Sequence, residues 1–390
     1  SLRDGAKFSD GTDVTAADFV ASYERATSEK SIYRQFFTFV DSVEAKDDKT
    51  ITITLKHPFT NLKERFVNVR VVPASMGEDA LKAKPVGTGP YKYENITATE
   101  VTAVPNEYYN GNEPAKAPTL KWQSLKDDSA RLAAAVGGTV DIMEAVPASA
   151  QDQLKAAGWN VESKPGYGNP FLMFNTQKAP FDKPEVRRAF VKAVDKQKLI
   201  SSALEGQAVE ATSFLPEANP AYKKPATDLS YDKDAATKLL SDAGVTDLEI
   251  NLVTTDHPWI LALVPQIKSD FEALGVKVNH TQMASSDMYA NVTDVDDPSY
   301  DIVLAPGDPS VFGIIISWWN GDNVWTKRRD GWQTSDPESF NQLQTLISEA
   351  GELDGDEAKA KWGEAQDLLA EKTVIFPLVF RNMITGSNPA

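Results

Sequence analysis

Aromatic side chains gather in one polar segment of the chain. Four of the eight tryptophans lie within fifteen residues, at Trp318, Trp319, Trp325 and Trp332. Residues 320–323 read Asn-Gly-Asp-Asn, which is typical of a loop. Aromatic faces beside amide and carboxylate groups suit a pocket with apolar walls and a few orienting polar atoms. We therefore select Trp318, Trp319, Asn323 and Trp325 as candidate ligand-binding residues; in the alternative, at least two of the tryptophans only pack the core.

Two charged residues and one further tryptophan follow apolar runs of strand length. Asp308 comes after residues 302–304, Arg381 after residues 376–380, and Trp259 after residues 248–253. Loops at strand ends are the usual place for ligand contacts in open α/β sheets. An arginine can pair with a carboxylate through its two-pronged guanidinium, and an aspartate can pair with an ammonium group. Asp308 and Arg381 therefore motivate a zwitterionic ligand, although Asp308 could simply start a turn and Arg381 could lie on the surface.

Residues typical of catalysis or metal binding are scattered or missing. The three histidines, His57, His257 and His280, lack metal-ligand spacing, and there is no cysteine. The chain contains no serine nucleophile elbow, HExxH motif or phosphate-binding glycine loop. We expect no catalytic residue, no metal and no cofactor. Because 56 acidic residues allow many carboxylate pairs, a hydrolase stays open as an alternative.

Composition limits the kinds of partner. The formal net charge of −16 argues against nucleic acid and against anionic membrane surfaces. No apolar run reaches the roughly 18 residues that a membrane helix needs. No signal peptide or lipid-anchoring cysteine is visible. A length of 390 residues is enough for two or three domains.

The elements that must hold the candidate residues alternate between strand and helix, which predicts an α/β architecture. Apolar or alternating runs predict strands, and apolar positions three or four apart predict helices. The expected strands are residues 51–55, 171–174, 248–253, 276–278 and 302–304, and the expected helices are residues 131–136, 184–194, 233–243, 260–274 and 356–370.

Residues 171–200 carry the most distinctive pattern. A strand ends at Asn175, the pair Pro180-Phe181 follows, and a helix then contains Val186-Arg187 and ends near Asp195. Further matches occur in order at residues 2–19, 86–91 (Val-Gly-Thr-Gly-Pro-Tyr), 138–142 and 231–244. Together these motifs resemble the extracellular solute-binding proteins of family 5, the peptide- and nickel-binding subunits of ABC importers.

The resemblance implies a type II periplasmic-binding-protein-like fold with two lobes and a small extra domain. The implied boundaries are residues 1–84 for a partial accessory domain, 85–200 for lobe I, 201–377 for lobe II, and 378–390 for a return into lobe I. Both chain ends look truncated relative to the family. The resemblance also implies that Tyr33, Tyr167, Asn169 and Phe171 face the ligand. The tryptophan that peptide-binding members carry after the strand at residues 302–304 is absent, since residues 305–309 read Ala-Pro-Gly-Asp-Pro.

The expected function is ligand capture for an ABC importer. Two lobes would close around a small ligand, a short peptide or related compound, and the closed form would meet a membrane permease. The resemblance implies a monomer outside the cytoplasm, in the bacterial periplasm or as a cell-surface lipoprotein. A secreted hydrolase is one alternative, and a sensor or adhesin with the same fold is another.

Overall fold

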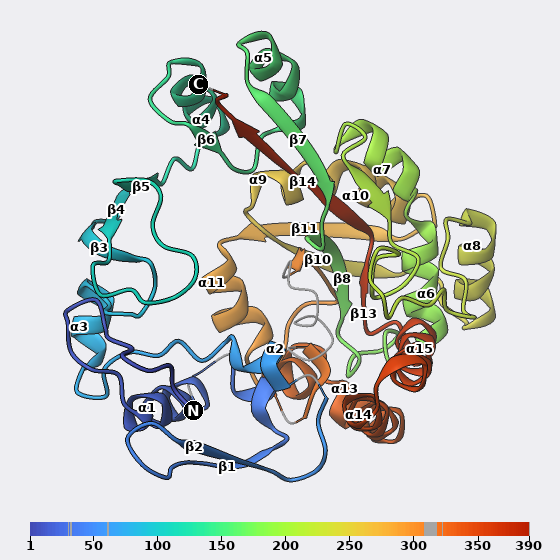
Figure 1. Ribbon diagram of the computed structural model, residues 1–390. Helices are drawn as coiled ribbons and strands as arrows, with labels where there is room; N and C mark the ends of the chain where they lie inside the picture. Colours follow the sequence, from blue (N-terminus) through green and yellow to red (C-terminus); the bar gives the residue numbers. More distant parts are fainter. Residues whose placement is uncertain (30, 32, 61, 308–317, 322, 390) are drawn as a thin grey trace. The chain divides into compact units, whose positions relative to one another are not determined.

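The computed structural model describes residues 1–390 except residues 30, 32, 61, 308–317, 322 and 390. The chain forms two compact units, Ser1–Ala133 and Ala134–Ala390. Figure 1 gives the elements of both units in sequence colours.

The first unit contains two small antiparallel sheets. One is the hairpin of β1 (Val40–Ala45) and β2 (Ile51–Leu55), and the other joins β3 (Tyr91–Ile96), β4 (Glu100–Pro105) and β5 (Leu120–Gln123). Its helices are α1 (Ala16–Ala26), η1 (Arg34–Phe37), α2 (Leu62–Phe66) and α3 (Glu78–Ala83), and α4 (Asp128–Val136) continues into the second unit. Helix α1 begins where Asp18 Oδ2 accepts the backbone N–H of Thr15 at 2.8 Å, which satisfies a donor at the helix start.

The second unit is built on a five-stranded sheet in the order β11-β10-β12-β8-β13. Its strands are β8 (Asn169–Phe174), β10 (Glu249–Thr255), β11 (Lys277–Met283), β12 (Ile302–Gly307) and β13 (Ile375–Pro377). Strand β10 pairs in parallel with β11 and β12, whereas β8 is antiparallel to both β12 and β13. The strands predicted at residues 171–174, 248–253, 276–278 and 302–304 all form.

Helices cover one face of this sheet. They are α6 (Pro184–Ala193), α7 (Lys196–Ser202), α8 (Lys233–Asp242), α9 (Pro258–Leu261) and α10 (Val264–Glu272). Leu172 and Phe174 of β8 enter the core that these helices share. The helix predicted over residues 260–274 is instead two helices, α9 and α10. Pro265 lies in the first turn of α10, where its missing N–H is tolerated, so the chain restarts a helix there.

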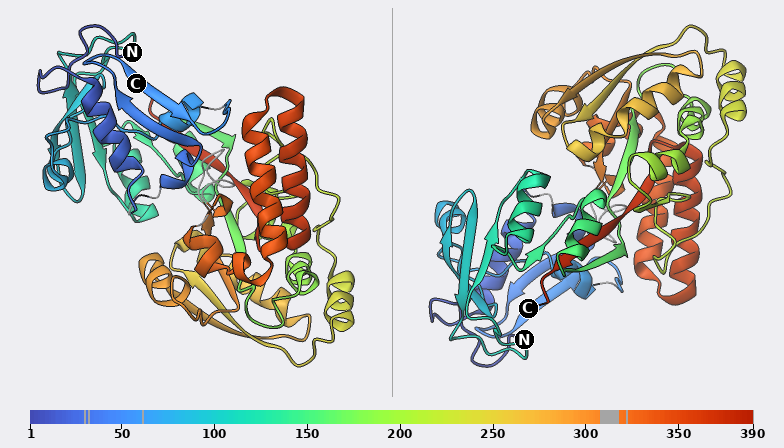
Figure 2. Two further views of the ribbon diagram at one scale, coloured as in Figure 1. Left: turned by 90° about the horizontal axis from the view of Figure 1, so that it is seen from below. Right: turned by 90° about the horizontal axis from the view of Figure 1, so that it is seen from above.

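Further described helical elements follow β11 and β12. They are α11 (Ser285–Met288), η3 (Tyr289–Thr293), η4 (Trp325–Arg329), α13 (Trp332–Ser335), α14 (Pro337–Glu352) and α15 (Gly355–Lys372). Helices α14 and α15 lie side by side as the orange-red pair in Figure 2. None of the described helices combines the length and the apolar character that crossing a bilayer requires.

A second sheet of this unit joins β6 (Ile142–Met143), β14 (Val379–Ser387) and β7 (Asn160–Pro165), and β9 (Ala208–Glu210) also pairs with β14. Two short passages join the two sheets directly, from β7 to β8 through residues 166–168 and from β13 to β14 through Leu378 (Figure 1). The two passages run together, because Leu378 N–H donates to Pro170 O and Arg381 N–H donates to Gly168 O, both at 2.8 Å. The elements η2 (Ala148–Ala150) and α5 (Gln151–Ala156) precede β7.

Candidate functional site

An aromatic cluster forms around the start of β8. The ring of Phe171 lies 4.7 Å from that of Trp318 and 6.1 Å from that of Trp325, centroid to centroid, and the two tryptophan rings are 5.2 Å apart. Phe214 adds an edge contact to Trp318 at 5.6 Å. We call Phe171, Phe214, Trp318 and Trp325 the aromatic cluster. The structure thus brings together three of the residues selected from the sequence.

The cluster lies on the face of the sheet opposite the helix-covered core. Side chains alternate along a strand, so Asn169 and Phe171 point to one face of β8 while Leu172 and Phe174 point to the other. Only the second pair joins the core beneath α6 to α10. Asn169 therefore shares a face with the aromatic cluster.

The tryptophans of this segment differ in exposure. Trp319 and Trp332 are fully buried, 5.2 Å apart, and Trp332 Nε1 donates to Ser339 Oγ at 2.9 Å. Trp318 is 3% exposed, whereas Trp325 is half-buried. Trp325 is therefore the cluster tryptophan best placed for a ligand, and Trp319 and Trp332 pack the interior.

Asn323 shapes the loop that carries Trp325. Its Oδ1 accepts the backbone N–H groups of Trp325 at 2.8 Å and of Thr326 at 3.3 Å, and its Nδ2 donates to Asn320 O at 3.1 Å. These bonds satisfy donors at the start of η4. The side-chain amide of Asn323 thus forms hydrogen bonds with the backbone of its own loop.

Asn169 has a buried acceptor without a partner. The residue is 1% exposed, and its Nδ2 donates to the carbonyl of half-buried Tyr167 at 3.0 Å. Among the described residues, nothing donates to Asn169 Oδ1. The side chain lies over Gly307, where a Cβ would come within 2.6 Å of Oδ1. A buried acceptor left unpaired is unfavourable, by about 1–3 kcal/mol.

Arg381 and Trp259, both selected from the sequence, contact each other. The guanidinium carbon of Arg381 lies 4.2 Å from the ring centroid of Trp259. Trp259 packs against the core that holds Leu172 and Phe174. The backbone of Arg381 is also bound next to Asn169, because Arg381 N–H donates to Gly168 O at 2.8 Å.

Two further candidates come from other parts of the chain. Tyr33 is in the first unit, where the residue is 40% exposed and its ring centroid lies 6.3 Å from that of Phe36. Asp308 falls outside the described residues, so the structure gives no position for it.

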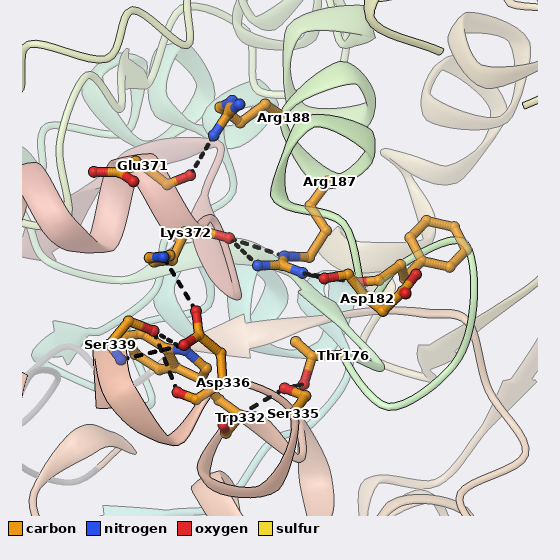
Figure 3. Close-up of polar contacts among 11 residues, drawn as sticks. Thr176, Asp182, Arg187, Arg188, Trp332, Ser335, Asp336, Ser339, Glu371 and Lys372 are labelled. Atoms are coloured by element: carbon orange, nitrogen blue, oxygen red, sulfur yellow. Dashed lines mark hydrogen bonds and ion pairs between the residues drawn. The ribbon is translucent and has the colours of Figure 1, made fainter. Parts of the chain in front are cut away.

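A partly buried polar frame supports the segment that carries the tryptophans (Figure 3). Asp330 O, which follows η4, accepts Thr176 N–H at 2.9 Å and Thr176 Oγ1 at 2.6 Å. Thr176 Oγ1 also lies 2.6 Å from Ser335 Oγ of α13, and Lys372 pairs with Asp336 at 3.1 Å. Thr176, just after β8, thus holds both the residue that follows η4 and the last residue of α13.

Arg187, from the distinctive motif, belongs to this frame and not to the aromatic cluster. Its Nη1 donates to Phe181 O at 2.7 Å and its Nε to Lys372 O at 2.8 Å (Figure 3). Burial lowers the pKa of Arg187 to about 10, so the guanidinium stays charged near neutral pH. Burial likewise raises the pKa of Asp330 to about 8.

Sequence reasoning missed three residues in or beside the aromatic cluster, namely Phe214, Tyr289 and Arg329. Arg329 lies against the rings of Tyr289 and Trp325 and forms an ion pair with Asp294 at 2.6 Å. Tyr289 and Arg329 are 40 positions apart, so no local spacing pointed to the contact. Within the described part of the chain, no group of three or more His, Asp and Glu residues is placed to hold a metal ion.

Comparison with known proteins gives a family match and a fold match. A family model described as bacterial extracellular solute-binding proteins, family 5 middle, matches residues 1–325. The glutathione-binding protein GsiB of Salmonella typhimurium is 29% identical over 309 residues, which cover 75% of this chain and 59% of that protein. The chain therefore spans about 59% of the length of this relative.

Solved structures share the fold across the chain. NikA from Brucella suis, in complex with Fe(III)-EDTA, superposes with a TM-score of 0.83 at 20% identity, covering 100% of this chain and 83% of that one. A dipeptide-binding protein from Pseudoalteromonas sp. SM9913, in complex with Met-Leu, gives a TM-score of 0.83 at 19% identity with the same coverage. The predicted fold, that of periplasmic binding proteins, is confirmed.

Proposed function

The chain belongs to the bacterial extracellular solute-binding proteins of family 5, and we propose that it is the ligand-capturing subunit of an ABC importer. One observation of this chain supports the proposal most. Asn169 Oδ1, buried and unpaired among the described residues, shares a face of β8 with the half-buried Trp325. A few polar atoms beside aromatic walls are what small-molecule sites use to bind and orient a ligand.

We propose that the ligand is a short peptide or a related compound. Asn169 Oδ1 accepts hydrogen bonds, and a peptide amide or ammonium group supplies N–H donors. Trp325 offers ring surface to an apolar or aromatic group, and the buried Trp318 packs behind it. The related GsiB is named for glutathione, and one structure of the same fold is described with Met-Leu.

The other candidate contacts stay part of the proposal on sequence grounds. Tyr33 and Tyr167 are proposed from the family resemblance, and Asp308 and Arg381 from charge. For Arg381 and Trp259, ligand binding would have to use or open the contact that they make with each other. Trp319 and Asn323 contribute by holding the loop that carries Trp325.

We propose closure as the mechanism and a permease as the partner. The two passages between the sheets of the second unit, residues 166–168 and Leu378, are the places where a small backbone change would reorient one sheet against the other. A ligand that binds the closed form better shifts the population toward it. An ABC permease would then receive the ligand from a monomeric protein outside the cytoplasm, in the periplasm or anchored as a lipoprotein.

Native mass spectrometry of the purified chain tests the proposal. Met-Leu, glutathione and a panel of other di- and tripeptides are added singly, and a one-to-one complex is expected with at least one. Trp325→Ala should weaken that complex with little loss of stability. Trp319→Ala, the matched buried control, should lower the free energy of unfolding by ~3–5 kcal/mol. Turnover of the panel without a stable complex would favour the hydrolase instead.

A further inference from the structure

Arg329 occupies the angle between two aromatic rings from different turns. Its guanidinium carbon lies 3.9 Å from the ring centroid of Tyr289, in η3, and 4.3 Å from that of Trp325, in η4. The two ring centroids are 5.9 Å apart and the ring planes are inclined by 67°. A cation over the face of a tryptophan or tyrosine is attracted by the ring quadrupole, so the guanidinium holds both rings at once.

Asp294 fixes the guanidinium in that angle. Arg329 Nε donates to Asp294 Oδ1 at 2.6 Å and Nη2 donates to Asp294 Oδ2 at 3.0 Å, the two-pronged arrangement that sets the plane of the group. The Arg329 side chain is 13% exposed and that of Asp294 26%, so the pair is partly shielded from solvent. Asp294 N–H donates to Tyr289 O at 2.8 Å, which ties the carboxylate to the turn that carries the tyrosine.

The backbone of η4 is held by other groups. Tyr300 Oη donates to Arg329 O, and Asp330 N–H donates to Trp325 O at 2.9 Å. Asn323 satisfies the start of the turn. The side chain of Arg329 is therefore not required to form η4, and its contacts act on the orientation of the Trp325 ring.

We propose that Arg329 is a positioning residue that fixes the Trp325 indole within the aromatic cluster and so determines how a ligand group meets that ring. The inference rests on the proposed function for its consequence in binding, but the orientation of Trp325 can be measured without a ligand. A lysine would keep the charge but lose the planar group that both rings and Asp294 contact.

Fluorine NMR of the full chain labelled with 5-fluorotryptophan provides the test. The Trp325 resonance is assigned from its absence in Trp325→Phe. We expect it to shift or broaden in Arg329→Gln and, to a lesser extent, in Arg329→Lys. Arg328→Gln is the matched control, because the neighbouring Arg328 contacts Asp294 O at 3.1 Å and Asp296 at 3.4 Å and no described ring, and it should leave the resonance unchanged.

An unchanged Trp325 resonance in Arg329→Gln would overturn the inference. If Arg329→Gln fails to fold, Asp294→Asn is measured instead, because it keeps the arginine and removes its ion pair. A shift or broadening of the Trp325 resonance in that variant would support the inference, and an unchanged resonance would overturn it.

Met-Leu and glutathione are then the binding probes: a probe that binds the wild type should bind Arg329→Gln about threefold to thirtyfold more weakly. Equal affinity for both proteins would also overturn the inference. If the wild type binds neither probe, the proposed function fails for these ligands, whereas the resonance still decides the role of Arg329.

Discussion

Asp330 and Asn169 are buried polar residues with opposite implications. Asp330 has no exposed surface, and while its Oδ1 accepts Trp332 N–H at 2.8 Å, its Oδ2 has no partner among the described residues. It belongs to the polar frame described above, so we expect its unpaired oxygen to affect the stability of the fold. Asn169 lies beside the aromatic cluster, so its unpaired oxygen bears on binding.

Asp330 predicts a pH-dependent stability. Burial raises the pKa of its carboxyl to about 8, whereas the unfolded chain has the ordinary value of 3.8. Between these values the native state keeps a proton that the unfolded state has lost, so this group's contribution to stability falls as pH rises. The slope approaches ~1.4 kcal/mol per pH unit.

The neutral variant Asp330→Asn removes that slope. Asparagine keeps the shape of the side chain and the acceptor for Trp332 N–H, but its amide does not titrate. The stability of the variant relative to the wild type should therefore increase steadily from pH 5 to pH 8. Urea unfolding at several pH values measures the difference. A difference that stays constant over this range would show that the carboxyl is already ionised in the native state.

Asn169 predicts a loss of binding without a loss of stability. Asn169→Leu removes the unpaired Oδ1 together with one bond, from Nδ2 to Tyr167 O, so the free energy of unfolding should change by less than about 1 kcal/mol. Affinity for a ligand that donates to Oδ1 should fall by roughly tenfold, following about 1.4 kcal/mol per decade. Calorimetric titration with the ligand found by mass spectrometry measures the affinity.

Asn323→Leu is the matched comparison. In the wild type, Asn323 Oδ1 accepts two backbone N–H groups at the start of η4. Asn323→Leu should therefore lose stability as well as affinity. Equal affinity for the wild type and Asn169→Leu would remove Asn169 from the site.

At the scale of elements, the sequence predicted the regular strands and helices and missed the short turns. Apolar periodicity is a local signal, so the strands at residues 171–174 and 248–253 and the helix at residues 356–370 were found. The orientations of Trp318 and Trp325 depend on Phe171 and Arg329, and the carbonyl that Thr176 binds lies 154 positions away. Such contacts arise only after the chain folds, which is why Trp319 was selected together with the more exposed Trp325.

The turn between η4 and α13 requires a glycine. Gly331 has φ of +70°, a region that side chains rarely adopt, and a Cβ there would overlap the side chain of Gln177. Gly321 in the same segment has φ of +66° with no atom within 4 Å of the Cβ position. Gly321→Ala should therefore show the backbone penalty alone, roughly 1–2 kcal/mol.

Gly331→Ala should lose more stability than Gly321→Ala, because it has the same backbone penalty and must also displace the side chain of Gln177. Chemical denaturation of the two variants gives the comparison. If both lose the same stability, Gln177 moves aside freely and the glycine is needed for its backbone conformation only.

At the scale of the whole molecule, the motifs identified the family more firmly than they identified the ligand. The pattern at residues 171–200 contains residues of the core and the polar frame, such as Phe181 and Arg187, whose contacts hold the fold of this chain together. The residues beside the aromatic cluster are not part of that pattern. Family membership was therefore predictable from the sequence, whereas the surroundings of Trp325 were not.

The passage from β7 to β8 offers a test of closure through a pair of glycines. A Cβ on Gly166 would lie 2.6 Å from the backbone oxygen of Arg381, so Gly166→Ala must push the two passages apart. A Cβ on Gly168 meets no atom within 4 Å, so Gly168→Ala fits and serves as the control.

If the sheets reorient about these passages, small-angle scattering should show a smaller radius of gyration when the wild type and Gly168→Ala bind ligand. Gly166→Ala should show a smaller change and a weaker affinity, because strands held apart cannot reach the same closed form. A full ligand-induced change in Gly166→Ala, equal to that of the wild type, would place the closing motion elsewhere in the chain.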